Sequence, residues 1–427
     1  MLSKSFPYLS DSTLKKAVLV IFTVWVAVQA GLAVYFWGVP QQSDAQTYIR
    51  IAERCIRAGA WYPNETSVYS PYIWNPGFVN FLVLQLKVFG TVNANVIFNI
   101  FMNIGAAAGI FVLARRYFNV RTAYLAVVLY CLTYSNLFVV LSAGTEIPFL
   151  FLATTALCLC GSRKYRWIIL AGVLFALANW VRPLVLIFLP AALGMFALER
   201  RRSFSYVALL VPMLLVILAI GKASEVRMGY FVTQSTTSPV NLIMTANDKA
   251  YGGVATSIFS DKTSSAYIEN EDSLTFRERG DIWKRRAIEW IKAHPGRYCA
   301  LYVKKLAGLY IEDSWADRPI LGNSGFADSV FVKKSVGTSE FAATAAVMFL
   351  KSVVYYIILA LFAYSLVKNW RKLDFGRLLL LSIAVFGTLL TCVFCVSPRY
   401  HHPFFFVITI FAASGLNVLL SGKKKEV

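Results

Sequence analysis

Four charged side chains lie at the ends of apolar runs, where they could act on a ligand at a membrane surface. They are Asp44, Glu146, Arg182 and Arg399. A carboxylate can take a proton from a hydroxyl group, and guanidinium groups bind phosphate oxygens well. Ionisable groups at such boundaries are candidates for function. If the fold brings these residues to one side of the membrane, they predict acid–base chemistry beside an anionic group.

Three of these residues also have a simpler interpretation. Asp44 and Glu146 both lie where a helix is expected to begin, so each could do no more than complement the helix dipole. Arg182 could be an anchor that extends toward lipid headgroups. The functional interpretation depends on the three coming from separate loops on the same side of the membrane.

Asp44 belongs to a predicted amphipathic helix that begins at Ser43. Its apolar face, at helical spacing, comprises Ala45, Tyr48, Ile49, Ala52, Cys55 and Ile56. Ser43 and Gln46 have the spacing of a capping box, and Gly59 is expected to end the helix. A basic amphipathic helix that follows a span is expected to lie in the headgroup plane. That position would hold Asp44 at the membrane surface.

The composition is that of a membrane protein with several spans. The 427 residues are 58% hydrophobic, with a mean hydropathy of +0.59. Ten spans are predicted, at 17–37, 94–114, 122–142, 146–160, 167–181, 183–198, 204–220, 341–367, 377–396 and 403–420. We therefore expect an all-α polytopic membrane protein with about ten transmembrane helices and juxtamembrane helices in the first outer loop.

The expected organisation has three parts. Residues 1–220 would form a transmembrane module, whose first outer loop is 38–93. Residues 221–340 would form a mainly helical outer loop domain, with helices near 277–293 and 297–312. Residues 341–427 would supply the last spans and a basic tail. The loop domain is too short and polar to be an independent enzyme, but it is large enough to cover a site.

The net charge of +20 has a topological explanation. If the short segment 76–90 is juxtamembrane and does not cross, six basic clusters fall on one side. These clusters lie within 4–16, 115–121, 163–166, 200–202, 368–377 and 423–425. The positive-inside rule then places both termini in the cytoplasm. The sequence gives no support to nucleic-acid binding. We expect an integral plasma (bacterial inner) membrane protein with an extracytoplasmic active site.

Two charged loop segments differ in what they predict. The segment from Glu312 to Asp317 collects carboxylates, and a solvated loop is the favoured interpretation there. Ser397 to Pro403 is a compact outer loop with adjacent histidines, which rarely chelate one metal ion well. In that loop we favour Arg399 and Tyr400 as contacts to a headgroup or phosphate.

The order of these motifs resembles that of the GT-C glycosyltransferases. A span is followed by Asp44-Ala-x-x-Tyr48, then by an aromatic loop ending in Pro76-Gly77, and then by a short helix closing with Val88-Phe89-Gly90. Later come Glu146, the basic residue before Pro183, and Arg399-Tyr400 before the last span. Within the superfamily, the chain is most similar to the protein mannosyltransferase and lipid A aminoarabinose transferase group. The similarity covers most of the N-terminal 200 residues.

The resemblance implies inverting transfer of a sugar from a polyprenyl or dolichyl phosphate to a hydroxyl of a glycan, lipid or protein. Asp44 would be the general base, and Glu146 would orient the acceptor or share a divalent cation, Mg or Mn, with Asp44. Arg182, Arg399 and Tyr400 would bind the donor phosphate. The residues expected to contact substrate are Tyr48, Tyr72, Trp74, Asn75 and His401. The aminoarabinose transferases have a lysine at the position of Asn75, so the phosphate contact must differ here.

Two other functions remain open at this point. An O-antigen ligase or polymerase would use a diphosphate-linked glycan and depend on outer-loop Arg and His residues, such as Arg399 and His401. A lipid or glycan transporter would need a polar path through the centre of the bilayer. The charged groups of this sequence instead gather at span ends.

Overall fold

A computed structural model describes residues 10–65, 72–322 and 338–421. The two long loops predicted at 38–93 and 221–340 each include a segment outside these residues. The first half contains α1 (Asp11–Tyr35), α2 (Ser43–Arg57), α3 (Pro76–Phe89), α4 (Ala94–Tyr117), α5 (Val120–Leu132), α6 (Tyr134–Phe138), α7 (Glu146–Cys160), α8 (Tyr165–Val181), α9 (Leu189–Leu198) and α10 (Phe204–Met228). The second half contains α11 (Ser238–Ile243), α12 (Phe276–Ala293), α13 (Pro295–Tyr310), α14 (Arg318–Leu321), α16 (Ser339–Asn369), α17 (Phe375–Val393) and α18 (His402–Leu420).

The chain is an integral membrane protein built from helices. Six helices of the described part are long and apolar enough to span a bilayer, namely α1, α4, α10, α16, α17 and α18 with the turn before it. A seventh candidate is a bent pair formed by α5 and the segment 134–141, and α3, α7, α8 and the segment 185–198 are shorter apolar helices. The polytopic all-α fold is confirmed, and the count of ten crossings stays a prediction.

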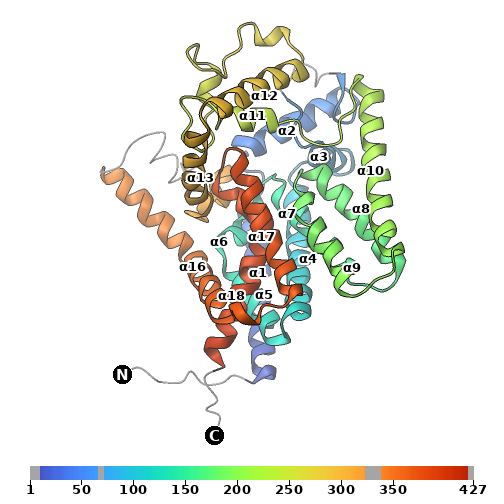
Figure 1. The fold of residues 1–427 in the computed structure, drawn as a ribbon, viewed down its shortest axis with the longest axis vertical. Helices are drawn as coiled ribbons and strands as arrows, with labels where there is room; N and C mark the ends of the chain where they lie inside the picture. The colour runs from blue at the N-terminus through green and yellow to red at the C-terminus, as the bar shows by residue number, and fades with distance from the viewer. Residues whose placement is uncertain (1–9, 66–71, 323–337, 422–427) are drawn as a thin grey trace.

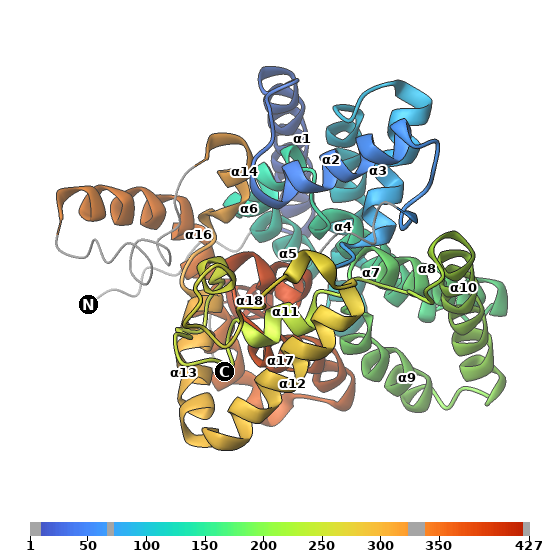
Figure 2. The same ribbon diagram turned by 90° about the horizontal axis from the view of Figure 1, so that it is seen from above.

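Helix α18 lies at the centre of the bundle. Every residue from His402 to Gly415 is buried, and α18 packs against α16, α5 and α17, as the view from above shows (Figure 2). An apolar helix with no exposed face along this length must be enclosed by protein on all sides. The residues just before α18 are therefore held rigidly at one end of the bundle.

The span predicted over 122–142 is not one continuous helix in the structure. The helix breaks at Thr133, which has extended backbone (φ −71°, ψ 128°), and the two parts are bent by 69°. Polar side chains satisfy the backbone groups that the break frees: Thr133 Oγ1 donates to the Leu129 carbonyl at 2.7 Å, and Asn136 Nδ2 donates to the Tyr130 carbonyl at 3.0 Å. Such pairing lets a helix break inside a membrane protein.

The basic loops come together at one end of the bundle. Arg116 at the end of α4 pairs with Glu199 after α9, and Arg201 donates to the Gly161 carbonyl between α7 and α8 at 3.0 Å. Arg377 at the start of α17 donates to the Tyr117 carbonyl at 3.0 Å. These contacts put four of the predicted basic clusters on one face, as the positive-inside interpretation requires.

Helices α2 and α3 lie at the opposite end, far from the start of α1 and the end of α18 (Figure 1). The start of α3 packs on the end of α8, where a Cβ on Gly77 would lie 2.6 Å from the Trp180 carbonyl carbon. The helix that follows it, α4, also begins at this end, where Asn95 Nδ2 donates to the Ser142 carbonyl at 3.3 Å. Both ends of α3 therefore lie near the same end of the bundle, which favours a juxtamembrane helix.

The predicted capping box of α2 is wrong. The N-cap residue is Gln42, and no side chain caps the helix. Ser43 instead adopts a left-handed backbone conformation, with φ 58°, so its hydroxyl does not serve the first turn. The predicted apolar face holds for Ala45, Tyr48, Ala52 and Cys55, which are buried, whereas Ile56 is exposed. Helix α2 packs on α3 through this face.

The segment after α10 has its own small core. Buried residues of α11, α12 and α13 form a cluster around Trp283 and Trp290 that also includes Cys395, which follows α17. The two predicted helices of this segment appear as α12 and α13, and α12 begins with a capping box between Thr275 and Glu278. Helix α13 packs against α17 and the turn before α18, so this segment is attached directly to the last spans.

Candidate active site

Two acid–guanidinium pairs meet at the end of the bundle where α2 lies. Asp44 in the first turn of α2 pairs with Arg399 from the turn before α18. Glu146, the first residue of α7, pairs with Arg182 at the end of α8, with 2.7 Å between Oε1 and Nη1. The structure thus brings together all four charged residues that the sequence singled out.

The ring of Tyr400 joins the two pairs. The Arg182 guanidinium lies 5.6 Å from the centre of this ring, and the Arg399 guanidinium lies 5.3 Å from it. Cations at this distance are attracted to the face of an aromatic ring. The Tyr400 ring therefore lies near both guanidinium groups.

The two residues before Glu146 in the sequence help to fix its position. Arg182 Nη1 also donates to Thr145 Oγ1 at 3.2 Å, so the residue before the acid helps to hold the cation. Gly144 lies so close that a Cβ there would be 2.6 Å from Glu146 Oε2. Real Cβ atoms almost never lie under 3 Å from another atom, so a side chain at position 144 would force the Glu146 carboxylate to move.

The two pairs differ in their access to solvent. The side chains of Asp44 and Arg399 are 32% and 30% exposed, whereas those of Glu146 and Arg182 are 8% and 11% exposed. A ligand can reach the first pair without any rearrangement of the second. The open pair is suited to contact substrate, and the buried pair is suited to orient and support it.

Aromatic side chains of the first loop surround Asp44. The Tyr48 hydroxyl accepts a hydrogen bond from Asn75 Nδ2 at 2.6 Å, and the Tyr48 ring lies 5.3 Å from that of Trp74. Tyr72 lies 5.3 Å from Trp74 in turn. Burial, together with the nearby charges of Asp44 and Glu146, raises the pKa of Tyr48, so its phenol stays neutral. Burial also raises the pKa of Tyr72 to about 12.

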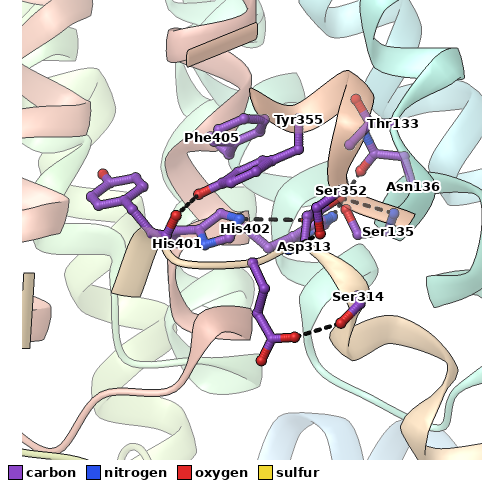
Figure 3. Close-up of polar contacts among 12 residues, drawn as sticks. Thr133, Ser135, Asn136, Asp313, Ser314, Ser352, Tyr355, His401, His402 and Phe405 are labelled. Carbon is purple, nitrogen blue, oxygen red and sulfur yellow. Dashed lines mark hydrogen bonds and ion pairs between the residues drawn. The ribbon is translucent and has the colours of Figure 1, made fainter. Parts of the chain in front are cut away.

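His401 does not face an open surface, although the sequence predicted a substrate contact in an outer loop. Its side chain is 1% exposed, and its ring stacks between Tyr310 and Tyr355 at 5.7 and 5.2 Å. Its Nδ1 donates to the Leu309 carbonyl at 2.8 Å. Figure 3 shows this enclosed position beside Asp313.

The prediction of a solvated loop for the acidic segment after α13 is wrong. Glu312, Asp313 and Asp317 are at most 1% exposed. They pair with Arg318, His401 and Lys351, respectively. Buried carboxylates require such partners, and these form a junction between the loop segment and the spans. We refer to Glu312, Asp313, Asp317 and their partners as the carboxylate junction.

The carboxylate junction holds the break of the bent span. Asp313 Oδ2 accepts from the Ser135 backbone N–H at 3.1 Å, and Asp317 Oδ2 accepts from the Tyr134 hydroxyl at 2.8 Å. The neighbouring His402 donates through Nε2 to Asn136 Oδ1 at 3.0 Å, since the Asn136 amide nitrogen is used by Tyr130. In the sequence, the adjacent histidines and the cluster of carboxylates were the features that could have indicated this network. Neither feature indicated that these side chains are buried.

A cavity lies beside α2, on a side of the helix away from Asp44. Within the described ranges no three His, Cys, Asp or Glu side chains are arranged to hold a metal ion, and Asp44 and Glu146 are each paired with an arginine. A cavity of about 300 Å³ is lined by the polar face of α2, including Gln46, Arg50 and Glu53, and by the start of α4. These residues lie about half a helical turn around α2 from Asp44.

The fold and these pairs define a polytopic helical membrane protein with a charged site at one end of its bundle. Residues 75–222 match the family described as dolichyl-phosphate-mannose-protein mannosyltransferase. This match agrees, over the part of the chain that it covers, with the predicted resemblance to the GT-C protein mannosyltransferase group. The matched residues include Glu146 and Arg182, while Asp44 and Arg399 lie outside them. No curated protein matches the sequence.

Solved structures with a similar course of the chain include two of the Archaeoglobus fulgidus oligosaccharyltransferase. The apo form has a TM-score of 0.45 at 13% identity and covers 94% of this chain and 50% of its own. The complex of AglB with an inhibitory peptide and a dolichol-phosphate has a TM-score of 0.47 at 14% identity, with coverages of 95% and 50%. The present chain thus spans about half the length of these proteins.

A third similar structure is ArnT from Cupriavidus metallidurans bound to undecaprenyl phosphate. It has a TM-score of 0.38 at 13% identity and covers 93% of this chain and 79% of its own. All three TM-scores lie below 0.5, so these likenesses do not bear on the roles of individual residues. Those roles rest on the geometry described above.

Proposed function

We propose that this protein is a membrane glycosyltransferase that moves a sugar from a polyprenyl or dolichyl phosphate to an acceptor hydroxyl on the extracytoplasmic face. The observation that carries the proposal is the accessible Asp44–Arg399 pair beside the buried Glu146–Arg182 pair. The family match at 75–222 supports a lipid-phosphate-linked sugar as donor. The apolar bundle gives a lipid tail a place beside the site.

Donor binding would free the catalytic base. The phosphate of the donor is an anion, and Arg399 is the more exposed of the two guanidinium groups. When the phosphate takes Arg399 as its partner, Asp44 loses its ion pair and becomes available to accept a proton. Arg182 stays with Glu146 and adds positive potential through its place beside Tyr400.

The transfer itself would be a single displacement with inversion. The acceptor oxygen attacks the anomeric carbon from the face opposite the phosphate, and its proton passes to Asp44. The bond between the anomeric carbon and the phosphate oxygen breaks, and polyprenyl phosphate leaves with the bonding electron pair. Arg399 and Arg182 offset the charge that develops on this leaving group. Glu146 orients the acceptor through its fixed position at the start of α7.

The remaining parts of the site would select and enclose the substrates. Tyr48, Tyr72, Trp74 and Asn75 would contact the sugar, because stacked rings and an amide suit the faces and hydroxyls of a carbohydrate. The segment 221–340 would cover the site and contribute to acceptor choice. The basic end of the bundle would face the cytoplasm, and the site would then lie on the extracytoplasmic side of the plasma membrane.

The proposal is tested with the purified full chain and a panel of polyprenyl-phosphate sugars. Mass spectrometry should detect transfer to an added acceptor or hydrolysis of one donor, and the Asp44→Asn variant should not turn it over. A diphosphate-linked glycan used in preference, with Arg399 and His401 essential and Asp44 dispensable, would favour the ligase alternative. Bound donor that is moved across vesicles without cleavage would favour a transporter.

A further inference from the structure

His401 is attached to the loop segment through both of its ring nitrogens. Nδ1 lies 2.8 Å from the Leu309 carbonyl oxygen. Because a carbonyl oxygen can only accept, Nδ1 must carry a hydrogen. The other ring nitrogen, Nε2, faces Asp313 Oδ1 at 3.5 Å. Neither atom of this second contact has a hydrogen-bond partner in the part of the chain that the structure describes.

The count of donors and acceptors requires one more hydrogen at this contact. With a hydrogen on Nδ1, a neutral imidazole presents only a lone pair at Nε2, and an ionised carboxylate presents only acceptors. Both side chains are at most 1% exposed, so two facing acceptors would leave an uncompensated buried charge. A proton on Nε2, or on the carboxyl group of Asp313, removes that conflict and makes the pair neutral overall.

The surrounding cations cannot replace this proton. Arg318 is paired with Glu312, and Lys351 is paired with Asp317. The other oxygen of Asp313 accepts from the Ser135 backbone, which is a neutral donor. His401 is therefore the group that compensates Asp313.

We propose that Asp313 and His401 share one proton and act as a positioning pair, which sets Arg399 where the donor phosphate binds. His401 ends the short helix of residues 398–401 that also carries Arg399. The stacking of the His401 ring between Tyr310 and Tyr355 fixes the rotation of this helix. This proposal rests on the proposed function, in which Arg399 contacts the phosphate.

The pair also links two parts of the chain. Leu309 lies at the end of α13 and Asp313 just after it, both in the loop segment, whereas Arg399 lies in the turn before the central helix α18. A movement of α13 is transmitted to Arg399 through His401, because His401 contacts the loop segment and lies in the same short helix as Arg399.

Four variants separate positioning from simple destabilisation. His401→Asn keeps a donor near the Leu309 carbonyl and removes Nε2, and Asp313→Ala removes the carboxyl group. Asp313→Asn can donate through its amide to a neutral His401 and still accept from Ser135. Asp317→Asn is the matched control, because Asp317 is an equally buried carboxylate of the carboxylate junction whose hydrogen bonds go to Tyr134 and Lys351.

The first measurement is the affinity of the full chain for polyprenyl phosphate in nanodiscs, with the KM values of donor and acceptor. We expect His401→Asn and Asp313→Ala to weaken donor binding about tenfold, as loss of a charged hydrogen bond predicts, with an unchanged acceptor KM. Asp313→Asn should bind the donor like the wild type, and Asp317→Asn should lower only the melting temperature. Unchanged binding in Asp313→Ala, or equal losses in Asp317→Asn, would overturn the positioning role.

The second measurement is the ¹⁵N spectrum of histidine-labelled protein, which does not depend on activity. The chain has three histidines, and His401→Asn assigns the signals of His401 by difference. We expect a protonated or hydrogen-bonded Nε2 that changes in Asp313→Ala. A resonance typical of an unprotonated, unbonded Nε2 in the wild type would exclude the shared proton. If the wild type binds no polyprenyl phosphate, the proposed function fails, while this spectrum still decides the state of the pair.

Discussion

Replacing Asp44 by asparagine separates catalysis from stability at the proposed site. Asparagine has nearly the same shape as aspartate but cannot take a proton from an acceptor hydroxyl. Loss of a general base lowers rates by about 10²–10⁴-fold, which corresponds to about 3–5 kcal/mol of activation free energy. The fold should tolerate the change, because Asp44 and Arg399 are about one-third exposed and pairs of that kind contribute at most about 1 kcal/mol.

The buried acid should behave in the opposite way. Glu146 and Arg182 are only 8% and 11% exposed, and Glu146→Gln leaves the guanidinium of Arg182 without its counter-charge. Breaking a buried pair on one side typically costs about 3–5 kcal/mol. We therefore expect a clear fall in melting temperature for Glu146→Gln and none for Asp44→Asn.

The assay combines three readouts on the same preparations: transfer in a single turnover, affinity for polyprenyl phosphate, and melting temperature. Asp44→Asn should bind the donor slightly more tightly than the wild type, because Arg399 no longer has a competing partner. Glu53→Gln is the matched control, since Glu53 is an exposed acid of the same helix. Retained transfer in Asp44→Asn, or a fall in its melting temperature as large as that of Glu146→Gln, would refute the reasoning.

Three further substitutions test the surroundings of the site. Gly144→Ala would place a Cβ 2.6 Å from Glu146 Oε2, so both activity and melting temperature should fall, and Glu146→Gln should not restore them. Tyr48→Phe removes the acceptor of the 2.6 Å bond from Asn75 and should cost about 1 kcal/mol of stability, with transfer reduced only a few-fold in a steady-state assay. Burial lowers the pKa of Lys305 to about 8, so the unfolded chain binds more protons between pH 8 and 10.5 and stability should rise with pH there. Lys305→Met should abolish that rise and melt higher than the wild type at pH 7.5.

The spans could be predicted from the sequence because lipid leaves the backbone few choices. A long apolar run must satisfy its hydrogen bonds within itself, which a helix does. The predicted bounds 146–160 are those of α7, and 204–220 falls short of α10 only because that helix continues to Met228 past the apolar run. The break at Thr133 could not be predicted, since the groups that satisfy it include Asp313, which lies far away in the chain.

The charged residues of the site could also be predicted, because they lie at span ends. Alternation of spans places every second loop on the same side, so Asp44, Glu146 and Arg182 could be assigned to one surface without knowledge of packing. The pairing of these residues could not be predicted, because Arg399 and Asp44 are separated by most of the sequence. The capping box at Ser43 failed for a local reason, namely the left-handed backbone of that residue.

The charges of the site explain why two pairs are needed. Asp44, Glu146, Arg182 and Arg399 sum to zero, and each acid has its own cation. A donor phosphate adds negative charge, which must be offset by a cation already present. If Arg182 moved, Glu146 would be left buried and unpaired at a cost of several kcal/mol. If Arg399 moves, only Asp44 is left, and because its side chain is about one-third exposed, water or an acceptor hydroxyl can stabilise it. The less costly rearrangement is therefore the one that produces an unpaired base next to the bound donor.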